Sequence, residues 1–227
     1  MKNMQDYNNL TIIGTSHISI ESIKQVTKFI TTNKPEIIAL ELDQKRFFAL
    51  TEKRQNSLKD IRKVGLKGYF INIIGAYIEK KLGKLVGVKP GSEMTTAINL
   101  ANKYNLKIAL IDQDINTTLK KLAKEITWKE KFRIIKDIIK GMVFKKGEVE
   151  KFDLTKVPSQ ELINKLVNKV KENYPSIYNV LIKERNEIMA KALYKIINTN
   201  KDNKILAIIG AGHEKELIRI IRTYNRI

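Results

Sequence analysis

The chain has 227 residues and no cysteine, and its 43 Lys and Arg against 24 Asp and Glu give a formal net charge of +19. The absence of cysteine excludes disulfides, thiol catalysis and cysteine-ligated zinc, and it fits an intracellular protein. The positive charge favours anionic partners, but the lysines are spread along the chain without a nucleic-acid recognition motif, so we expect no nucleic-acid partner. The N-terminal residues lack the apolar core of a signal peptide, and we expect a cytoplasmic location.

Apolar runs alternate with helical patterns in the first part of the chain. Two buried strands and two amphipathic helices are predicted there, the strands at 10–13 and 36–42 and the helices at 18–31 and 44–55. Asp43 is the N-cap candidate for the second helix. This alternation predicts an α/β fold with a central, mainly parallel sheet that is flanked by helices.

Residues 61–88 are apolar in their centre and basic at both ends. The central run, 64–78, is too short and too often interrupted by glycine to span a bilayer, so we predict a helical insertion. The sequence leaves three possible environments for residues 64–78: burial against the domain, a homodimer interface, or peripheral contact with a membrane. The dimer is slightly favoured over the membrane because an exposed apolar surface needs to be covered.

Helical periodicity dominates the second half of the chain. Four helices fill most of a helical region at about 115–199, namely 115–126, 128–142, 159–172 and 176–198. The remaining elements are helices at 93–105 and 214–224 and strands at 107–111 and 205–209. The length suits one domain, so we predict a single domain over 1–227 with a helical insertion at about 61–88.

The two histidines of the chain occupy equivalent positions. His17 closes Gly14-Thr15-Ser16-His17 after the first strand, and His213 closes Gly210-Ala211-Gly212-His213 after the last. Glycine permits a tight turn, and small residues let the backbone approach a ligand closely. Ligands of open α/β sheets bind at the carboxyl ends of strands, and imidazole is both a common metal ligand and a general base. We therefore predict one site that holds both histidines.

Acidic residues follow the two other predicted strands. Glu41 and Asp43 stand at the end of one, and Asp112 and Asp114 at the end of the other. Parallel strands would bring these groups to the same sheet edge as the histidines. Glu41 is the sharpest case, because a carboxylate at the end of an apolar strand must be paired, protonated or bound to a cation.

These segments, in this order, resemble the TraB family. The matching pieces also include Pro90-Gly91-Ser92-Glu93-Met94 and Glu184-Arg185-Asn186, and together they cover nearly the whole chain. The family is grouped with the Tiki metalloproteases and the erythromycin-esterase-like and ChaN-like proteins, which implies a central sheet flanked by helices. The resemblance is to archaeal members, many of which carry apolar C-terminal segments; the chain stops at Ile227 without one, and we expect no anchoring through such a tail.

The resemblance implies an active site formed by the two G-x-x-H histidines and the strand-end glutamate. Tiki-type relatives cleave peptides with a metal, and some TraB members are linked to the shutdown of peptide pheromones. The leading hypothesis is therefore a metal-dependent peptidase in which His17, Glu41 and His213 bind one divalent ion, Zn, Mn or Co. Two imidazoles and one carboxylate leave an open position for water. Three carboxylates remain open as general base: Asp43, Glu93 and Asp112.

Two arginines complete the predicted site. Arg185 is assigned a catalytic role, and Arg46, Glu93 and Asp112 are assigned to substrate binding. Either arginine is suited to hold a carboxylate or stabilise an oxyanion. The structural alternative is a buried ion pair with Glu41, Asp112 or Glu184. The functional alternative to a peptidase is a non-catalytic TraB domain that captures a peptide or associates with a membrane through 64–78.

Overall fold

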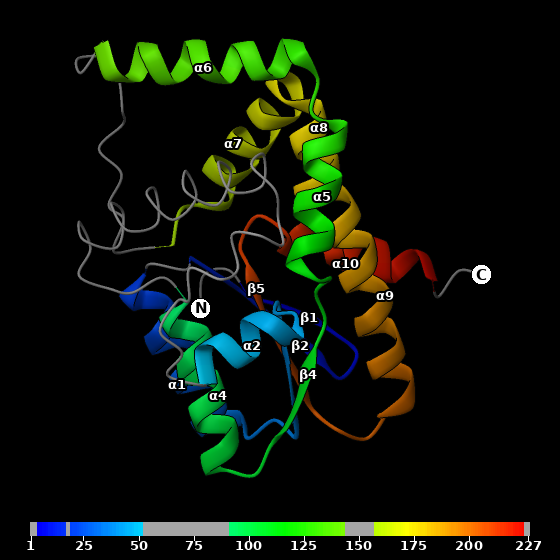
Figure 1. The fold of residues 1–227 in the computed structure, drawn as a ribbon. Coiled ribbons are helices and arrows are strands. Elements are labelled where there is room, and N and C mark those ends of the chain that lie inside the picture. The colour runs from blue at the N-terminus through cyan, green and yellow to red at the C-terminus, as the bar shows by residue number, and fades with distance from the viewer. Residues whose placement is uncertain (1–3, 17–18, 52–90, 144–156, 225–227) are drawn as a thin grey trace.

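A central sheet carries the fold in the computed structural model, which describes residues 4–16, 19–51, 91–143 and 157–224 (Figure 1). Its five strands lie in the order β1-β2-β5-β3-β4. Their bounds are β1 Met4–Tyr7, β2 Leu10–Thr15, β3 Ile37–Leu40, β4 Lys107–Leu110 and β5 Ile205–Gly210. The four strands β2 to β5 are the predicted ones, and they run parallel to one another. The predicted α/β fold with a mainly parallel sheet is confirmed.

The edge strand β1 was not predicted from the sequence. It pairs antiparallel with β2, so that Met4 lies opposite Ile13 and Tyr7 opposite Leu10. Its four residues, Met-Gln-Asp-Tyr, lack the apolar run of the other strands, and their burial is only partial. An edge strand of this kind is stabilised by pairing with its neighbour and not by a hydrophobic pattern of its own. Because β1 runs antiparallel to β2, the sheet is mixed.

The last strand of the chain lies in the middle of the sheet. Ile205 of β5 is in register with Leu10 of β2 on one side and with Ile37 of β3 on the other. The carboxyl ends of β2, β5, β3 and β4 therefore follow one another along a single edge. This order places the strand that precedes His213 directly beside the strand that precedes Glu41.

Helices cover both faces of the sheet, and side chains alternate between them as the period of a strand requires. On one face, Ile13, Ile38 and Ile208 pack with helices α1 Ile20–Asn33 and α4 Ser92–Lys103. On the other face, Ile12, Ala39 and Ala207 pack with helices α9 Glu184–Thr199 and α10 Glu214–Tyr224. Figure 1 shows the two helix pairs on opposite sides of the sheet.

The helical region begins with α5 Ile115–Glu125, α6 Trp128–Val143 and α7 Gln160–Asn173, close to their predicted bounds. The helix predicted over 176–198 is not uniform. It starts as α8 Pro175–Tyr178, passes through a π-helical segment at Asn179–Lys183, and continues as α9. π-Helical turns are frequent at functional sites, and this one ends at Lys183, two residues before Arg185.

Several sequence-based expectations fall outside the described residues. They are the position of His17, the helical insertion at 61–88 and the surface at 64–78. In the part of the chain that is described, no helix combines the length and hydropathy needed to cross a membrane.

Candidate functional site at the carboxyl edge of the sheet

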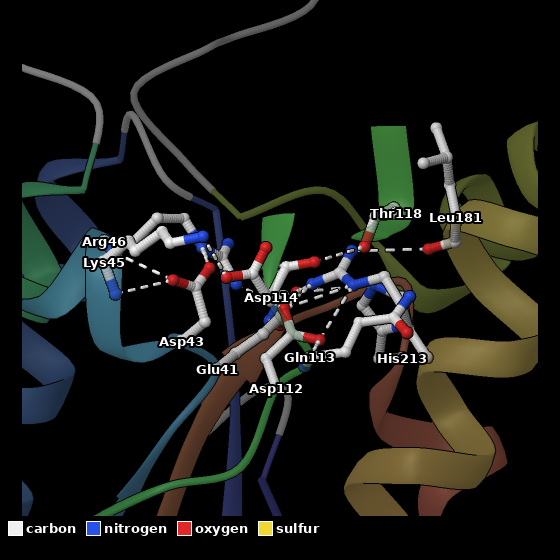
Figure 2. Close-up of polar contacts among 12 residues, drawn as sticks. Glu41, Asp43, Lys45, Arg46, Asp112, Gln113, Asp114, Thr118, Leu181 and His213 are labelled. Atoms are coloured by element: carbon white, nitrogen blue, oxygen red, sulfur yellow. Dashed lines mark hydrogen bonds and ion pairs between the residues drawn. The ribbon is translucent and has the colours of Figure 1, made fainter. Parts of the chain in front are cut away.

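Glu41 follows β3 and turns its carboxylate toward the end of β5. Its backbone N–H donates to the carbonyl of Ile208 at 3.1 Å, so the strand pairing continues to this residue. Oε2 accepts the N–H of Gly210 at 2.5 Å, and the residue is 4% exposed. The buried carboxylate expected from the sequence is thus held between two strands, at the edge where the polar groups gather (Figure 2).

His213 is fixed by the turn that joins β5 to α10. Its backbone N–H donates to the carbonyl of Gly210 at 2.9 Å, and Ala211 donates to Thr15 of β2 at the same distance. The imidazole is buried, with Nε2 3.6 Å from Oε1 of Glu41. Glu41 and His213, which stand 172 positions apart in the chain, are therefore neighbours at one sheet edge.

Asn186, in the first turn of α9, contacts the other side of the His213 ring. Its Oδ1 lies 2.6 Å from Nδ1, and the asparagine is 1% exposed. With Oδ1 turned toward the ring, this contact places a proton on Nδ1, and Nε2 is the ring nitrogen that faces Glu41. No role was predicted for Asn186 from the sequence; the signal that pointed to it was its place beside Arg185 in the Glu184-Arg185-Asn186 segment.

Arg185 joins Glu41 to Asp112. Nη2 donates to Oε1 of Glu41 and, at 2.6 Å, to Oδ2 of Asp112, while Nε donates to Oδ1 of Asp112 at 3.1 Å. Nη1 donates to the carbonyl of Leu181, in the π-helical segment, at 3.3 Å. Burial lowers the pKa of the guanidinium, but the two carboxylates outweigh burial and hold its pKa above the ordinary value. The third partner considered from the sequence, Glu184, pairs with Lys121 instead.

Arg46 enters the same network from α2 Gln44–Thr51. Its Nε donates to Asp43 at 2.7 Å and its Nη2 to Asp112 at 2.5 Å. The other oxygen of Asp43 accepts the backbone N–H groups of Lys45 and Arg46 at 2.8 and 3.0 Å, which is the predicted N-cap. Asp112 therefore connects the two arginines, and three carboxylates face two guanidinium groups in this cluster.

The remaining predicted residues have other positions. Glu93 is buried in the first turn of α4, a helix on the face of the sheet opposite to α9. Asp114 caps α5 and pairs with Lys45 at 2.5 Å. Within the described ranges, no three His, Cys, Asp or Glu side chains form a metal-binding group, and His17 stands outside those ranges.

Comparison with known proteins agrees with the motifs. The TraB/PrgY/gumN family matches residues 3–216. The uncharacterized protein MJ1365 of Methanocaldococcus jannaschii is 39% identical over 221 residues, which cover 94% of this chain and 53% of that protein. The human and mouse TraB domain-containing proteins are 22% and 21% identical over 194 residues, or 80% of this chain and 50% of theirs.

The chain thus spans about half the length of the curated relatives it matches. The family match, in contrast, includes every strand of the sheet and the segments that carry Glu41, Arg46, Asp112, Arg185 and His213. On this basis the chain belongs to the TraB/PrgY/gumN family.

Proposed function

We propose that the chain is a metal-dependent peptidase whose metal ligands are His17, Glu41 and His213. One observation carries the proposal: Asn186 orients the His213 ring so that Nε2 lies 3.6 Å from Oε1 of Glu41. Two ligands of a tetrahedral ion with bonds of about 2.1 Å are about 3.4 Å apart. The spacing of these two atoms therefore fits a shared divalent cation.

The surroundings of this pair also suit a cation. A ligating histidine in a metalloenzyme usually donates its second ring N–H to a neighbouring acceptor, and Asn186 provides one for His213. Glu41, Asp43 and Asp112 carry one more negative charge than Arg46 and Arg185 balance. A positive ion at Glu41 would offset this buried charge.

Arg185 and Arg46 would have different roles in such a site. A bound Zn, Mn or Co would supply a water of lowered pKa and polarise a peptide carbonyl. Arg185 is only 15% exposed and its hydrogen bonds reach Glu41 and Asp112, so it positions the Glu41 carboxylate. Arg46 is 32% exposed at the same edge and is the better placed to bind a substrate carboxylate or developing oxyanion.

A second candidate is a non-catalytic TraB domain that binds a peptide or associates with a membrane. The pairing of Arg185 with Glu41 favours it, because a buried carboxylate that is neutralised by a guanidinium needs no metal. The two candidates therefore assign different roles to Glu41, which is a metal ligand in the first and the ion-pair partner of Arg185 in the second.

Metal binding to Glu41→Gln separates the candidates. Wild type and variant are titrated with Zn²⁺, Mn²⁺ and Co²⁺, metal content is measured by elemental analysis, and peptide cleavage is assayed with each ion. We expect Glu41→Gln to stay folded by circular dichroism and to lose at least about tenfold in metal affinity, together with cleavage. Glu187→Gln, an exposed change in α9, is the control and should bind metal as wild type does.

The opposite result would support the second candidate. If Glu41→Gln unfolds while metal content per folded molecule stays at the wild-type value, Glu41 is a structural partner of Arg185 and the metal proposal is wrong.

A further inference from the structure

Helix α6 packs on the protein through its charged side. Glu130 accepts the backbone N–H of Ser176 at 2.8 Å, and Arg133 donates from Nη1 to the carbonyl of Asn173 at 2.6 Å. Asp137 accepts the hydroxyl of the tyrosine that follows Asn173. These three residues of α6 stand three and four positions apart, so they lie on one side of the helix. That side faces the junction between α7 and α8.

The opposite side of α6 carries an exposed apolar stripe. Trp128, Phe132 and Ile135 stand four and three positions apart, and they are 73%, 68% and 54% exposed. A surface helix normally buries its apolar stripe and exposes its charged side, and α6 does the reverse. Figure 1 shows α6 at the end of the molecule away from the sheet, beyond α5, α7 and α8. Its apolar stripe is therefore placed to meet a partner.

Lysines border this stripe on both sides. Around the helix axis, Lys131 lies on one side of it, and Lys129 and Lys136 lie on the other. Nζ of Lys131 is 4.4 Å from the centroid of the Trp128 ring. Among the side chains of α6 that the structure describes, 128–137, both acidic ones lie on the charged side that packs on the protein. The stripe and its lysines, called the outer face of α6 below, are thus apolar and positively charged.

An anionic lipid surface matches both properties of the outer face. Tryptophan favours the boundary between lipid headgroups and acyl chains, where phenylalanine and isoleucine can be buried. Lysine keeps its ammonium group at the headgroup phosphates while its methylene groups cover apolar surface. A second copy of α6 would complement the stripe but would bring lysines against lysines, which is unfavourable. The charge therefore favours lipid over self-association.

We infer that the outer face of α6 binds peripherally to an anionic lipid surface, with Trp128, Phe132 and Ile135 at the acyl boundary and the bordering lysines at the phosphates. This contact is separate from the sheet edge that holds Glu41, and it needs no metal. It also does not involve residues 64–78, so it goes beyond both candidate functions.

Tryptophan fluorescence tests the contact directly, because Trp128 is the one tryptophan of the chain. The full chain is titrated, in the presence of a chelator, with vesicles of phosphatidylcholine alone or of phosphatidylcholine and phosphatidylglycerol in equal amounts. Co-sedimentation measures the partition coefficient of the protein. We expect the emission of Trp128 to shift to shorter wavelength with the anionic vesicles and much less with the neutral ones. Added salt should weaken the binding.

A pair of matched double variants tests the apolar stripe. Phe132→Ser with Ile135→Ser keeps Trp128 as the reporter, and circular dichroism checks the fold. Phe48→Ser with Ile188→Ser removes the same two residue types at exposed positions of α2 and α9. The α6 variant should lose at least about tenfold in partition coefficient and the control no more than about twofold, because only the first pair would be buried in lipid.

A second pair tests the charge without altering the apolar stripe. Lys129→Gln with Lys136→Gln should weaken binding to the anionic vesicles by about 5- to 30-fold, since each lysine beside such a surface contributes to the attraction. Lys24→Gln with Lys28→Gln, at exposed positions of α1, removes the same net charge, and we expect a loss of at most about twofold because these lysines lie outside the outer face.

Three results would overturn the inference. They are no shift of Trp128 emission with anionic vesicles, equal losses in the α6 variants and their controls, and a dimer in light scattering that Phe132→Ser with Ile135→Ser dissociates while lipid has no effect. The last would assign the outer face to a second copy of the chain. Failure of metal binding would remove the proposed peptidase and leave the lipid result standing, and the reverse also holds.

Discussion

Gly14 of the first G-x-x-H turn is in direct contact with Glu214, the residue that follows the second. A Cβ at Gly14 would overlap Oε2 of Glu214 and would lie 3.2 Å from Cα of Ala211. Glu214 is 1% exposed, and its Oε2 has no hydrogen-bond partner among the described residues. The first glycine of the motif is therefore required by the packing of one turn against the other.

Gly14→Ala should destabilise the protein by about 1–3 kcal/mol, since the added Cβ forces the buried Glu214 side chain out of its position. Urea denaturation measures the change. Gly212→Ala is the matched control, because a Cβ there would meet only Cγ2 of Val167 at 3.9 Å. In a Glu214→Ala background the cost of Gly14→Ala should shrink. Equal costs for the two glycine substitutions would contradict the contact.

Glu214→Gln should change how stability depends on pH. Burial raises the pKa of the Glu214 carboxyl to about 7, against a smaller opposing effect of a hydrogen bond with Gln5, whereas the unperturbed value is 4.5. Between these values the folded state keeps a proton that the unfolded state has lost, so the free energy of unfolding falls as pH rises. Glutamine does not titrate, so Glu214→Gln removes this loss of stability. The free energy of unfolding of the variant, relative to that of wild type, should therefore increase between pH 4.5 and about 7, by at most about 3 kcal/mol.

Urea denaturation of metal-free protein across this pH range provides the measurement. Glu216→Gln is the control with the opposite sign, because the hydrogen bond with Arg219 lowers the pKa of Glu216. The ionised Glu216 carboxylate adds to the free energy of unfolding above about pH 4.5, and this contribution is lost as pH falls. Parallel pH profiles for wild type and Glu214→Gln would show that the Glu214 carboxyl titrates normally.

Asn186→Ala should weaken metal binding by about 10–100-fold, the usual cost of removing a group that orients a ligating histidine. The fold should persist, because the change removes one partner of His213 but leaves the turn hydrogen bond of its backbone. Isothermal titration with Zn²⁺ and circular dichroism check the two parts. Asn102→Ala, at an exposed position of α4, is the control. Unchanged Zn²⁺ affinity in Asn186→Ala would rule out this role.

Arg185→Met should be among the most destabilising single changes, at about 3–5 kcal/mol, because it leaves Glu41 and Asp112 buried without their shared cation. A double-mutant cycle with Asp112→Asn tests the cause. The double variant should lose less than the sum of the two single losses, since each change removes the charge that the other leaves unpaired. Additive losses would mean that the two side chains act independently.

Local pattern was sufficient for most of the secondary structure. The strands β2 to β5 are short apolar runs, and Asp43, the predicted N-cap, accepts the N–H groups that follow it. These features depend on neighbours within a few residues, which a sequence displays directly. The requirement that Glu41 have a partner was also predictable, because it follows from the cost of burying a charge.

Tertiary structure decided which residues meet. No local pattern places β5 between β2 and β3, yet this order brings His213 to Glu41. The choice of Arg185 as partner of Glu41, the contact of Asn186 with His213 and the overlap of Glu214 with Gly14 join residues 27 to 200 positions apart. Such contacts arise from how the helices pack on the two faces of the sheet, and packing depends on the shape of the whole core rather than on any one segment.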